Sequence, residues 1–120
     1  MRCFLHGKIH RLRVSETRLD YEGSLTLDTE LMDAAGFYPF EKVDIYDISN
    51  GARFSTYLIE GAAGSGQVCL NGAAARLAEP GDLIIVAGYT FMDEADGKKH
   101  RPTIVHVDQD NRIVRKEECE

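Results

Sequence analysis

Four short stretches of this chain combine glycine or asparagine turns with polar side chains that are able to do chemistry. They are "GKIHR" (7–11), "YEGS" (21–24), "NGARFSTY" (50–57) and "LNGAAA" (70–75). The second stretch ends in the dipeptide Gly23-Ser24. A second dipeptide of the same kind occurs at Gly64-Ser65. The dipeptide alone therefore does not distinguish an ordinary turn serine from one that is consumed chemically.

The third stretch places several chemically useful side chains on one strand. On a β-strand, Arg53, Ser55 and Tyr57 share one face, whereas Phe54 and Thr56 share the other. An arginine can bind a carboxylate with two hydrogen bonds, and a tyrosine can transfer a proton. Taken singly, each has an ordinary explanation as a surface ion-pair residue, a packed ring or a β-former. The same holds for the first stretch, in which Lys8 and His10 read as solvated strand residues.

Several familiar kinds of site are not indicated. The chain has neither GxSxG nor GxxxxGK[ST], the motifs of nucleophile-elbow hydrolases and of phosphate-binding loops. The glycine-rich "GAAGSG" (61–66) is not clearly followed by a helix and reads as a mobile loop. His6 and His10 lie four residues apart in a strand-like pattern, so no metal site is predicted. The cysteines have no CxxC spacing, which is typical of incidental thiols; they are Cys3, Cys69 and Cys119.

Size and charge narrow the class of protein. A chain of 120 residues suits one domain, 1–120, with a real core, and a site shared between subunits is worth considering at this size. The net charge of −6 argues against nucleic acid or an anionic membrane as a partner. The first fourteen residues contain no long apolar run, so neither a secretory signal nor a membrane span is predicted. The expected location is the cytoplasm.

The hydrophobic pattern predicts a mainly β domain with short helices. A helix should begin at Asp28 as its N-cap, bury Leu31, Met32 and Ala35, and end at Gly36. A solvated loop is expected at 93–102. Strands are expected at 2–14, 23–28, 42–48, 52–59, 68–70, 83–89, 103–108 and 112–117. Many short strands favour a closed barrel over an open sheet, because closure removes exposed edges.

As an ordered set, these motifs resemble the pyruvoyl-dependent L-aspartate 1-decarboxylase family. The resemblance runs from "GKIHR" through "YEGS", "AAG", "NGARFSTY" and "NGAAARLA" to "GDLIIVAGY", nearly the whole chain. It implies a six-stranded double-psi β-barrel in a homotetramer with sites at subunit boundaries. It also implies decarboxylation of L-aspartate to β-alanine and CO2 for pantothenate and coenzyme A biosynthesis.

The resemblance assigns roles to single residues. It implies self-cleavage between Gly23 and Ser24 into chains 1–23 and 24–120, with Ser24 converted into a covalent pyruvoyl group that forms a Schiff base with the substrate. Thr56 would donate a hydrogen bond to the oxyanion of cleavage, and Tyr57 would donate a proton during decarboxylation. The implied substrate-binding residues are Arg53, Lys8, His10, Tyr21, Asn71, Gly72, Ala73 and Ala74.

The distribution of charge supports a dianionic substrate. Aspartate carries two carboxylates, so an acidic protein must concentrate cations locally at its site. The basic residues in or beside the motifs are Lys8, His10, Arg11, Arg13 and Arg53. The acidic excess lies largely elsewhere, for example at 93–96 and 117–120.

The chain departs from the family pattern in three places, of which "YTFMDEADGKKHRP" (89–102) is one, and other functions stay open. Tyr46 stands where a tryptophan is frequent, which affects the shape of the pocket, and the loop 60–66 lacks a basic residue often found there. One alternative is an uncut barrel that serves as a binding or assembly module. Another is a pyruvoyl enzyme that decarboxylates a different amino acid. The sequence leaves open whether cleavage is spontaneous or needs a maturation factor.

Overall fold

The computed structural model describes residues 1–118, and Cys119 lies outside them. In chain order the elements are β1 (Arg2–Arg13), β2 (Glu16–Arg18), β3 (Ser24–Asp28), α1 (Thr29–Ala35), β4 (Lys42–Asp47), β5 (Arg53–Gly61), β6 (Val68–Asn71), the 3-10 helix η1 (Gly72–Arg76), β7 (Leu83–Met92), α2 (Glu94–Lys99), β8 (Thr103–Val107) and β9 (Ile113–Glu118). Among these elements, no helix is long and apolar enough to cross a membrane.

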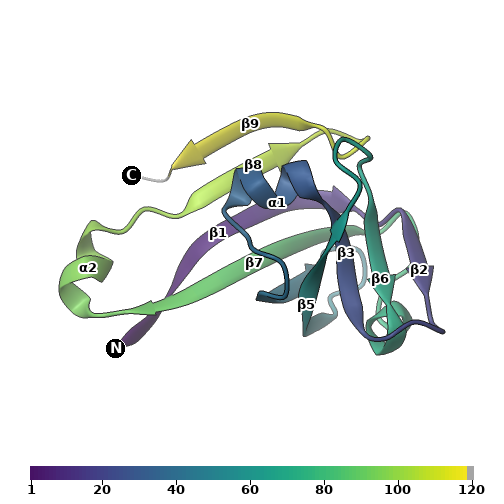
Figure 1. The fold of residues 1–120 in the computed structure, drawn as a ribbon, viewed down its shortest axis with the longest axis horizontal. Helices are drawn as coiled ribbons and strands as arrows, with labels where there is room; N and C mark the ends of the chain where they lie inside the picture. The colour runs from purple at the N-terminus through teal and green to yellow at the C-terminus, as the bar shows by residue number, and fades with distance from the viewer. Residues whose placement is uncertain (119–120) are drawn as a thin grey trace.

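The strands form one strongly bent sheet in the order β2-β6-β3-β5-β4-β7-β1-β8-β9. Three neighbouring pairs are parallel, namely β1 with β8, β2 with β6 and β3 with β5. Figure 1 shows β1, β7, β8 and β9 running along the long axis of the molecule, with β2, β3, β5 and β6 crossing them at one end. The predicted mainly β class and small barrel with short helices are confirmed. The barrel strands are accompanied by an additional short strand, β2, and by the β8–β9 hairpin.

The core lies inside the bend of the sheet. Strand β3 places its two alternating leucines in the core as the sequence predicts, since Leu25 and Leu27 are both fully buried. Leu25 is level with Leu58 of β5 on one side and with Leu70 of β6 on the other, so three leucines meet in one layer of the core. The other large residues that are almost completely buried are Ile9, Leu12, Val14, Leu31, Met32, Val43, Ile45 and Ile84.

The helix prediction for residues 28–36 is confirmed in detail. The Asp28 side chain accepts a hydrogen bond from the Glu30 N–H at 2.9 Å, which caps α1. Gly36 ends the helix with a φ of 78°, the left-handed conformation that glycine adopts without strain. The predicted inner face is also confirmed, since Leu31, Met32 and Ala35 are all buried.

The prediction of a loop over 93–102 is wrong. Residues 94–99 form α2, and none of its side chains is buried in the core. Its N-terminus is fixed by Asp93, whose carboxylate accepts a hydrogen bond from the Asp96 N–H at 3.0 Å. The segment lacks the apolar spacing from which a helix is usually recognised, and the cap and the flanking strands hold it instead.

Two carboxyl groups meet at the end of the barrel where β4 stops and β7 begins. Oδ1 of the buried Asp47 accepts hydrogen bonds from the N–H groups of Ser49 (2.8 Å) and Asn50 (3.1 Å). Its Oδ2 is buried and has no hydrogen-bond donor among the described residues. Burial is the main cause that raises the pKa of Asp47, followed by the neighbouring Asp82 carboxyl. The Asp47 carboxyl is therefore protonated more easily in the folded chain than in the unfolded one.

Replacing one acid of this pair by an amide should stabilise the protein near neutral pH. Because the pKa of Asp47 is raised in the folded state, its protonated carboxyl makes its full contribution to folding stability in acid. That contribution is lost as the pH rises through the folded-state pKa. Asp47→Asn keeps an oxygen for the Ser49 and Asn50 N–H groups and offers Asp82 an N–H donor. We expect a higher melting temperature than wild type near neutral pH and no gain in acid, measured by calorimetry over a pH series.

The control for this change lies on the same strand. Asp44 is only half-buried, so Asp44→Asn should not reproduce the pH-dependent gain. A melting temperature of Asp47→Asn equal to or below that of wild type near neutral pH would contradict the raised pKa of Asp47.

Candidate functional site

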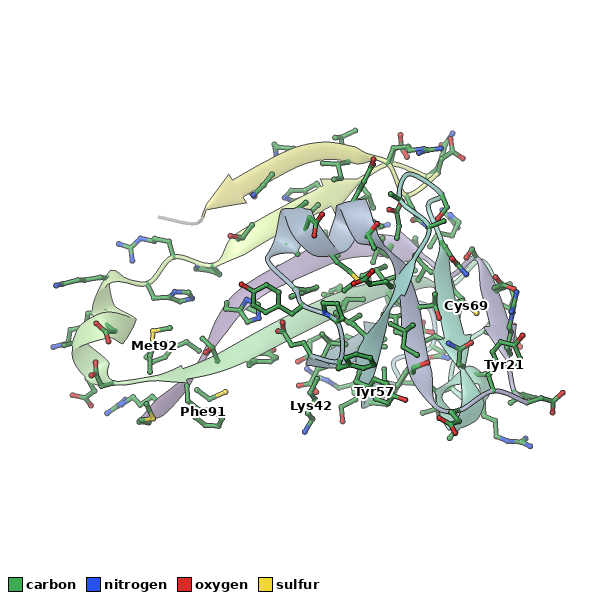
Figure 2. All side chains as sticks on the ribbon, viewed as in Figure 1. Tyr21, Lys42, Tyr57, Cys69, Phe91 and Met92 are labelled. Carbon is green, nitrogen blue, oxygen red and sulfur yellow. The ribbon has the colours of Figure 1, made fainter. Side chains whose placement is uncertain are left out.

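Strand β3 begins at Ser24 and lies between β5 and β6. On one side Ser24 is level with Asn71, the last residue of β6. On the other side, Leu25 pairs with Leu58 in parallel, and continuing this register backwards places Tyr57 beside Ser24 and Thr56 beside Gly23. Figure 2 shows Tyr57 near the end of β5, with Cys69 on β6 and Tyr21 toward β2.

The hydroxyl of Ser24 makes two hydrogen bonds, one as an acceptor and one as a donor. Ser24 is only 1% exposed, and its Oγ accepts a hydrogen bond from Nδ2 of Asn71 at 2.9 Å. The same Oγ donates to the carbonyl oxygen of Glu22 at 3.4 Å, a long hydrogen bond. The hydroxyl thus points back over the peptide segment that precedes it.

Gly72 lets η1 pack directly against the Gly23 backbone. Its φ is +65°, and a Cβ added there would lie 2.6 Å from the N of Gly23 and 2.7 Å from the carbonyl oxygen of Tyr21. Both distances are shorter than any normal contact, so only glycine fits. In the following turn of η1, Ala73 is exposed and Ala74 is buried, which keeps this wall of the site free of long side chains.

The Tyr21 ring is held by a residue that the sequence did not single out. Tyr21 is 56% exposed, and the Arg18 guanidinium lies 5.1 Å from the centre of its ring. Arg18 also donates hydrogen bonds to the Tyr21 hydroxyl at 3.1 Å and to the Glu16 carboxylate at 2.9 Å. These residues come from β2 and the turn after it. The strand has only three residues, too few for a recognisable pattern, so sequence reasoning missed Arg18.

Arg53 is the first residue of β5, whereas Gly23-Ser24 lies level with the middle of that strand. It is four residues before Tyr57 on the same face, about 13 Å along an extended strand. Its guanidinium stacks on the ring of Tyr46 at 4.3 Å, and the Tyr46 hydroxyl is 2.7 Å from that of Tyr89. This hydrogen bond, together with burial, raises the pKa of Tyr89 to about 12. Tyr46 therefore supplies an aromatic platform for the arginine at the position where a tryptophan is frequent.

The structure does not bring Lys8 and His10 to Ser24 within one chain. Both lie on β1, which is separated from β3 by β7, β4 and β5 in the order of the sheet, and no hydrogen bond among residues 1–118 joins either side chain to Ser24. His10 Nδ1 is buried without a hydrogen-bond partner among residues 1–118. Burial, followed by the charge of Lys8, lowers the pKa of His10, so near neutral pH it is a neutral hydrogen-bonding group and adds no positive charge.

The glycine-rich loop is already filled by a carboxylate of the same chain. Asp28 accepts hydrogen bonds from the N–H of Gly64 at 3.0 Å and from the N–H of Gly66 at 2.9 Å. These are the backbone donors that a phosphate would need. The loop therefore closes against the start of α1 and offers no phosphate cradle. Within the part of the chain that the structure describes, no group of three or more His, Cys, Asp or Glu side chains could hold a metal ion.

The fold and the geometry together define the class of site. It is a small barrel in which a buried serine follows a glycine, and an asparagine from the neighbouring strand binds the serine. The profile of the aspartate decarboxylase family matches residues 1–114. The chain is 56% identical to the aspartate 1-decarboxylase of Syntrophobacter fumaroxidans over 111 residues, 92% of this chain and 90% of that protein. It is 52% identical to the aspartate 1-decarboxylase of Corynebacterium efficiens over 114 residues, 95% of this chain and 84% of that protein. The chain belongs to the aspartate decarboxylase family.

A side chain at position 72 should displace the segment that carries the site. In Gly72→Ala, the new Cβ meets the Gly23 and Tyr21 backbone, and the left-handed φ adds strain. Gly51→Ala is the matched control, because Gly51 has a φ of +79° and open space around its Cβ. We expect Gly72→Ala to lose about 1–3 kcal/mol more stability than Gly51→Ala in urea unfolding. Equal losses would show that the contact with Gly23 is unimportant.

Proposed function

We propose that this protein decarboxylates L-aspartate to β-alanine and CO2, the step that supplies β-alanine for pantothenate and coenzyme A, using a pyruvoyl group made from its own Ser24. Membership of the aspartate decarboxylase family supports an enzyme of this type. The observation that carries the proposal is the Ser24 hydroxyl, which is buried, bound by Asn71 and turned back toward the preceding peptide. An ordinary turn serine has no need of such an arrangement.

The self-cleavage that we propose uses only groups of the chain and water. Oγ of Ser24 attacks the carbonyl carbon of Gly23, giving a cyclic tetrahedral adduct, and the C–N bond then breaks to leave an ester and a free amine. Removal of the Ser24 Cα proton expels the Gly23 carboxylate and leaves a dehydroalanine. Its imine tautomer takes up water and releases ammonia, so that residue 24 ends as a ketone. The products are chains 1–23 and 24–120.

The register assigns neighbouring residues to this chemistry. Thr56 is level with Gly23, where its hydroxyl would donate a hydrogen bond to the oxyanion that develops on the Gly23 carbonyl. Tyr57 is level with Ser24 and would later deliver a proton to the substrate carbon. No hydrogen bond joins either hydroxyl to Ser24 in the uncut chain, within the residues described, which fits roles that begin only once an oxyanion or a substrate is present.

The residues around Ser24 fit a pyruvoyl group in size and polarity. The wall formed by Gly72, Ala73 and Ala74 has only small side chains, which leaves room beside residue 24 for a substrate. When formed, the group supplies an electrophilic carbonyl that withdraws electrons from a bound amino acid. Arg53, about 13 Å along β5 from Tyr57, would bind a substrate carboxylate in the site of a neighbouring subunit, and Tyr21 would border the entrance.

A second copy of the chain is needed to complete this site. Lys8 and His10, the other residues proposed to bind substrate, lie on β1, which is not paired with β3 in its own chain. The buried Nδ1 of His10 lacks a partner within the described chain, as expected of a group that meets another subunit or the substrate. We therefore propose a homo-oligomer, a tetramer by resemblance, in which Lys8 and His10 reach the Ser24 of a neighbouring subunit.

The first test is the mass of the intact, denatured protein before and after warm incubation. We expect two species, 1–23 and 24–120, the larger with a pyruvoyl group in place of serine. Ser24→Ala should remain uncut, because it lacks the nucleophile. Ser65→Ala changes the other Gly-Ser dipeptide and should be cut as wild type is.

The outcome of this test separates the alternatives. One uncut species that stays uncut even after addition of cell extract, which would supply a maturation factor, would favour the non-enzymatic binding module. If cutting occurs, competition among aspartate, glutamate and neutral amino acids in a CO2-release assay identifies the substrate. Preference for an amino acid other than aspartate would overturn the substrate assignment but not the self-cleavage.

Mixed oligomers test whether the site is shared between subunits. Lys8→Ala and Ser24→Ala subunits should each have little activity alone. Co-expressed, they should recover turnover, because some sites then combine the Ser24 of one subunit with the Lys8 of another. The control is a mixture of Tyr57→Phe and Ser24→Ala subunits, which should not recover turnover. Tyr57 and Ser24 come from neighbouring strands of the same chain, so no site in this mixture contains both. Recovery in neither mixture would contradict the shared site.

A further inference from the structure

We propose that Cys69 is a positioning residue for the self-cleavage of this protein, because its thiol fixes the orientation of the Asn71 side-chain amide that binds Ser24. The inference rests on the proposed function and concerns the same site. It assigns a role to a buried cysteine whose type and spacing indicate none.

The four side chains involved form two facing pairs on β3 and β6. Ser24 lies opposite Asn71, and Thr26 lies opposite Cys69. Cys69 is 1% exposed, and its Sγ donates a hydrogen bond to Oδ1 of Asn71 at 3.3 Å. Nδ2 of Asn71 donates to Oγ of Ser24 and to Oγ1 of Thr26, both at 2.9 Å. A single amide thus connects the thiol to the proposed nucleophile, and Figure 2 shows Cys69 on β6 next to this region.

The amide of an asparagine can sit in its site in two orientations that differ by half a turn and have nearly the same shape. The hydroxyls of Ser24 and Thr26 can donate or accept, so they are compatible with both orientations. The thiol is the asymmetric partner. In one orientation of the amide the thiol donates to Oδ1, which is a good acceptor. In the other orientation the sulfur would have to accept from Nδ2, and sulfur is a poor acceptor. Cys69 therefore favours the orientation in which Nδ2 faces Ser24.

The thiol is also kept in the donor form. Burial raises the pKa of Cys69, and the negative charge of Glu16 adds to this effect. Glu16 is level with Cys69 on the neighbouring strand β2. The other charged group that acts on the thiol, Arg18, opposes the rise but is the smallest of the three influences. The sulfur thus remains protonated at neutral pH and continues to donate to Asn71.

The orientation of the amide matters for the nucleophile. With Nδ2 facing Ser24, the N–H group stabilises the negative charge that develops on Oγ as the hydroxyl proton leaves, and the proton stays directed toward the Glu22 carbonyl. With the amide turned over, Oδ1 would face Oγ, and the negative charge that develops on Oγ would lose its hydrogen-bond donor. A mixture of orientations would therefore lower the rate of cleavage without changing the fold.

The test compares three substitutions at position 69. Cys69→Ser keeps a donor, Cys69→Val fills the volume without one, and Cys69→Ala removes both. The first-order rate at which chain 24–120 forms from freshly purified uncut protein is followed by mass spectrometry. We expect Cys69→Ser to cut within about threefold of wild type, and Cys69→Val and Cys69→Ala to cut about tenfold more slowly. Cys3→Val, a change at an exposed cysteine, should cut at the wild-type rate.

Melting temperatures show whether a slow variant is merely unstable, because Cys69→Val fills the site and should unfold near the wild-type temperature. Rates for Cys69→Val equal to wild type would overturn the inference while leaving self-cleavage intact. Failure of the wild type to cut would count against the proposed function instead.

A second measurement decides the positioning role even in an uncut protein. The Asn71 side-chain N–H signals in an NMR spectrum should be protected from hydrogen exchange in wild type and in Cys69→Ser, and lose protection in Cys69→Val. Equal protection in all three would overturn the inference.

Discussion

The site depends on how one short strand is paired. Strand β3 has a parallel neighbour, β5, on one side and an antiparallel neighbour, β6, on the other. Because its leucines are locked into the core, a shift of one residue would turn every side chain of β3 to the other face. The hydrophobic register therefore also fixes Ser24, and with it the asparagine and the tyrosine that lie level with it. Ser24 is placed by the packing of Leu25, the residue next to it.

Much of the fold could be predicted because its signals are local. The cap at Asp28, the αL glycine at 36 and the alternation of Leu25 and Leu27 each act within a few residues, and the structure contains all three. Strand β2 and helix α2 were missed, because a three-residue strand and a helix without buried residues carry no periodic pattern. The pairing of β3 with β5 joins segments some thirty residues apart, which no local pattern encodes.

The candidate site, like the fold, has parts that could be predicted from the sequence and parts that could not. Ser24, Thr56, Tyr57 and Asn71 were identified as a set from their motifs, and sheet register brings these four together. The contacts of Arg18 with Tyr21 and of Cys69 with Asn71 were not predictable, although each joins residues only two or three positions apart, because they depend on side-chain orientations that no sequence pattern encodes. The electrostatic expectation also changed. His10 was counted among the cations, yet burial and the neighbouring positive charges lower its pKa, so that only the lysine and the arginines of that set are left to attract an anion.

The place of β1 in the sheet has a consequence for how the mature protein can unfold. This strand lies between β7 and β8 and pairs with both along much of its length. It belongs to the segment 1–23, so a cut after Gly23 would leave the small product held as an internal strand of the sheet, without any covalent link to the larger one. Unfolding would then separate two molecules, and refolding would depend on their concentration. A chain that folds once in one piece would thereby become a complex that, after dilution, does not reassemble readily.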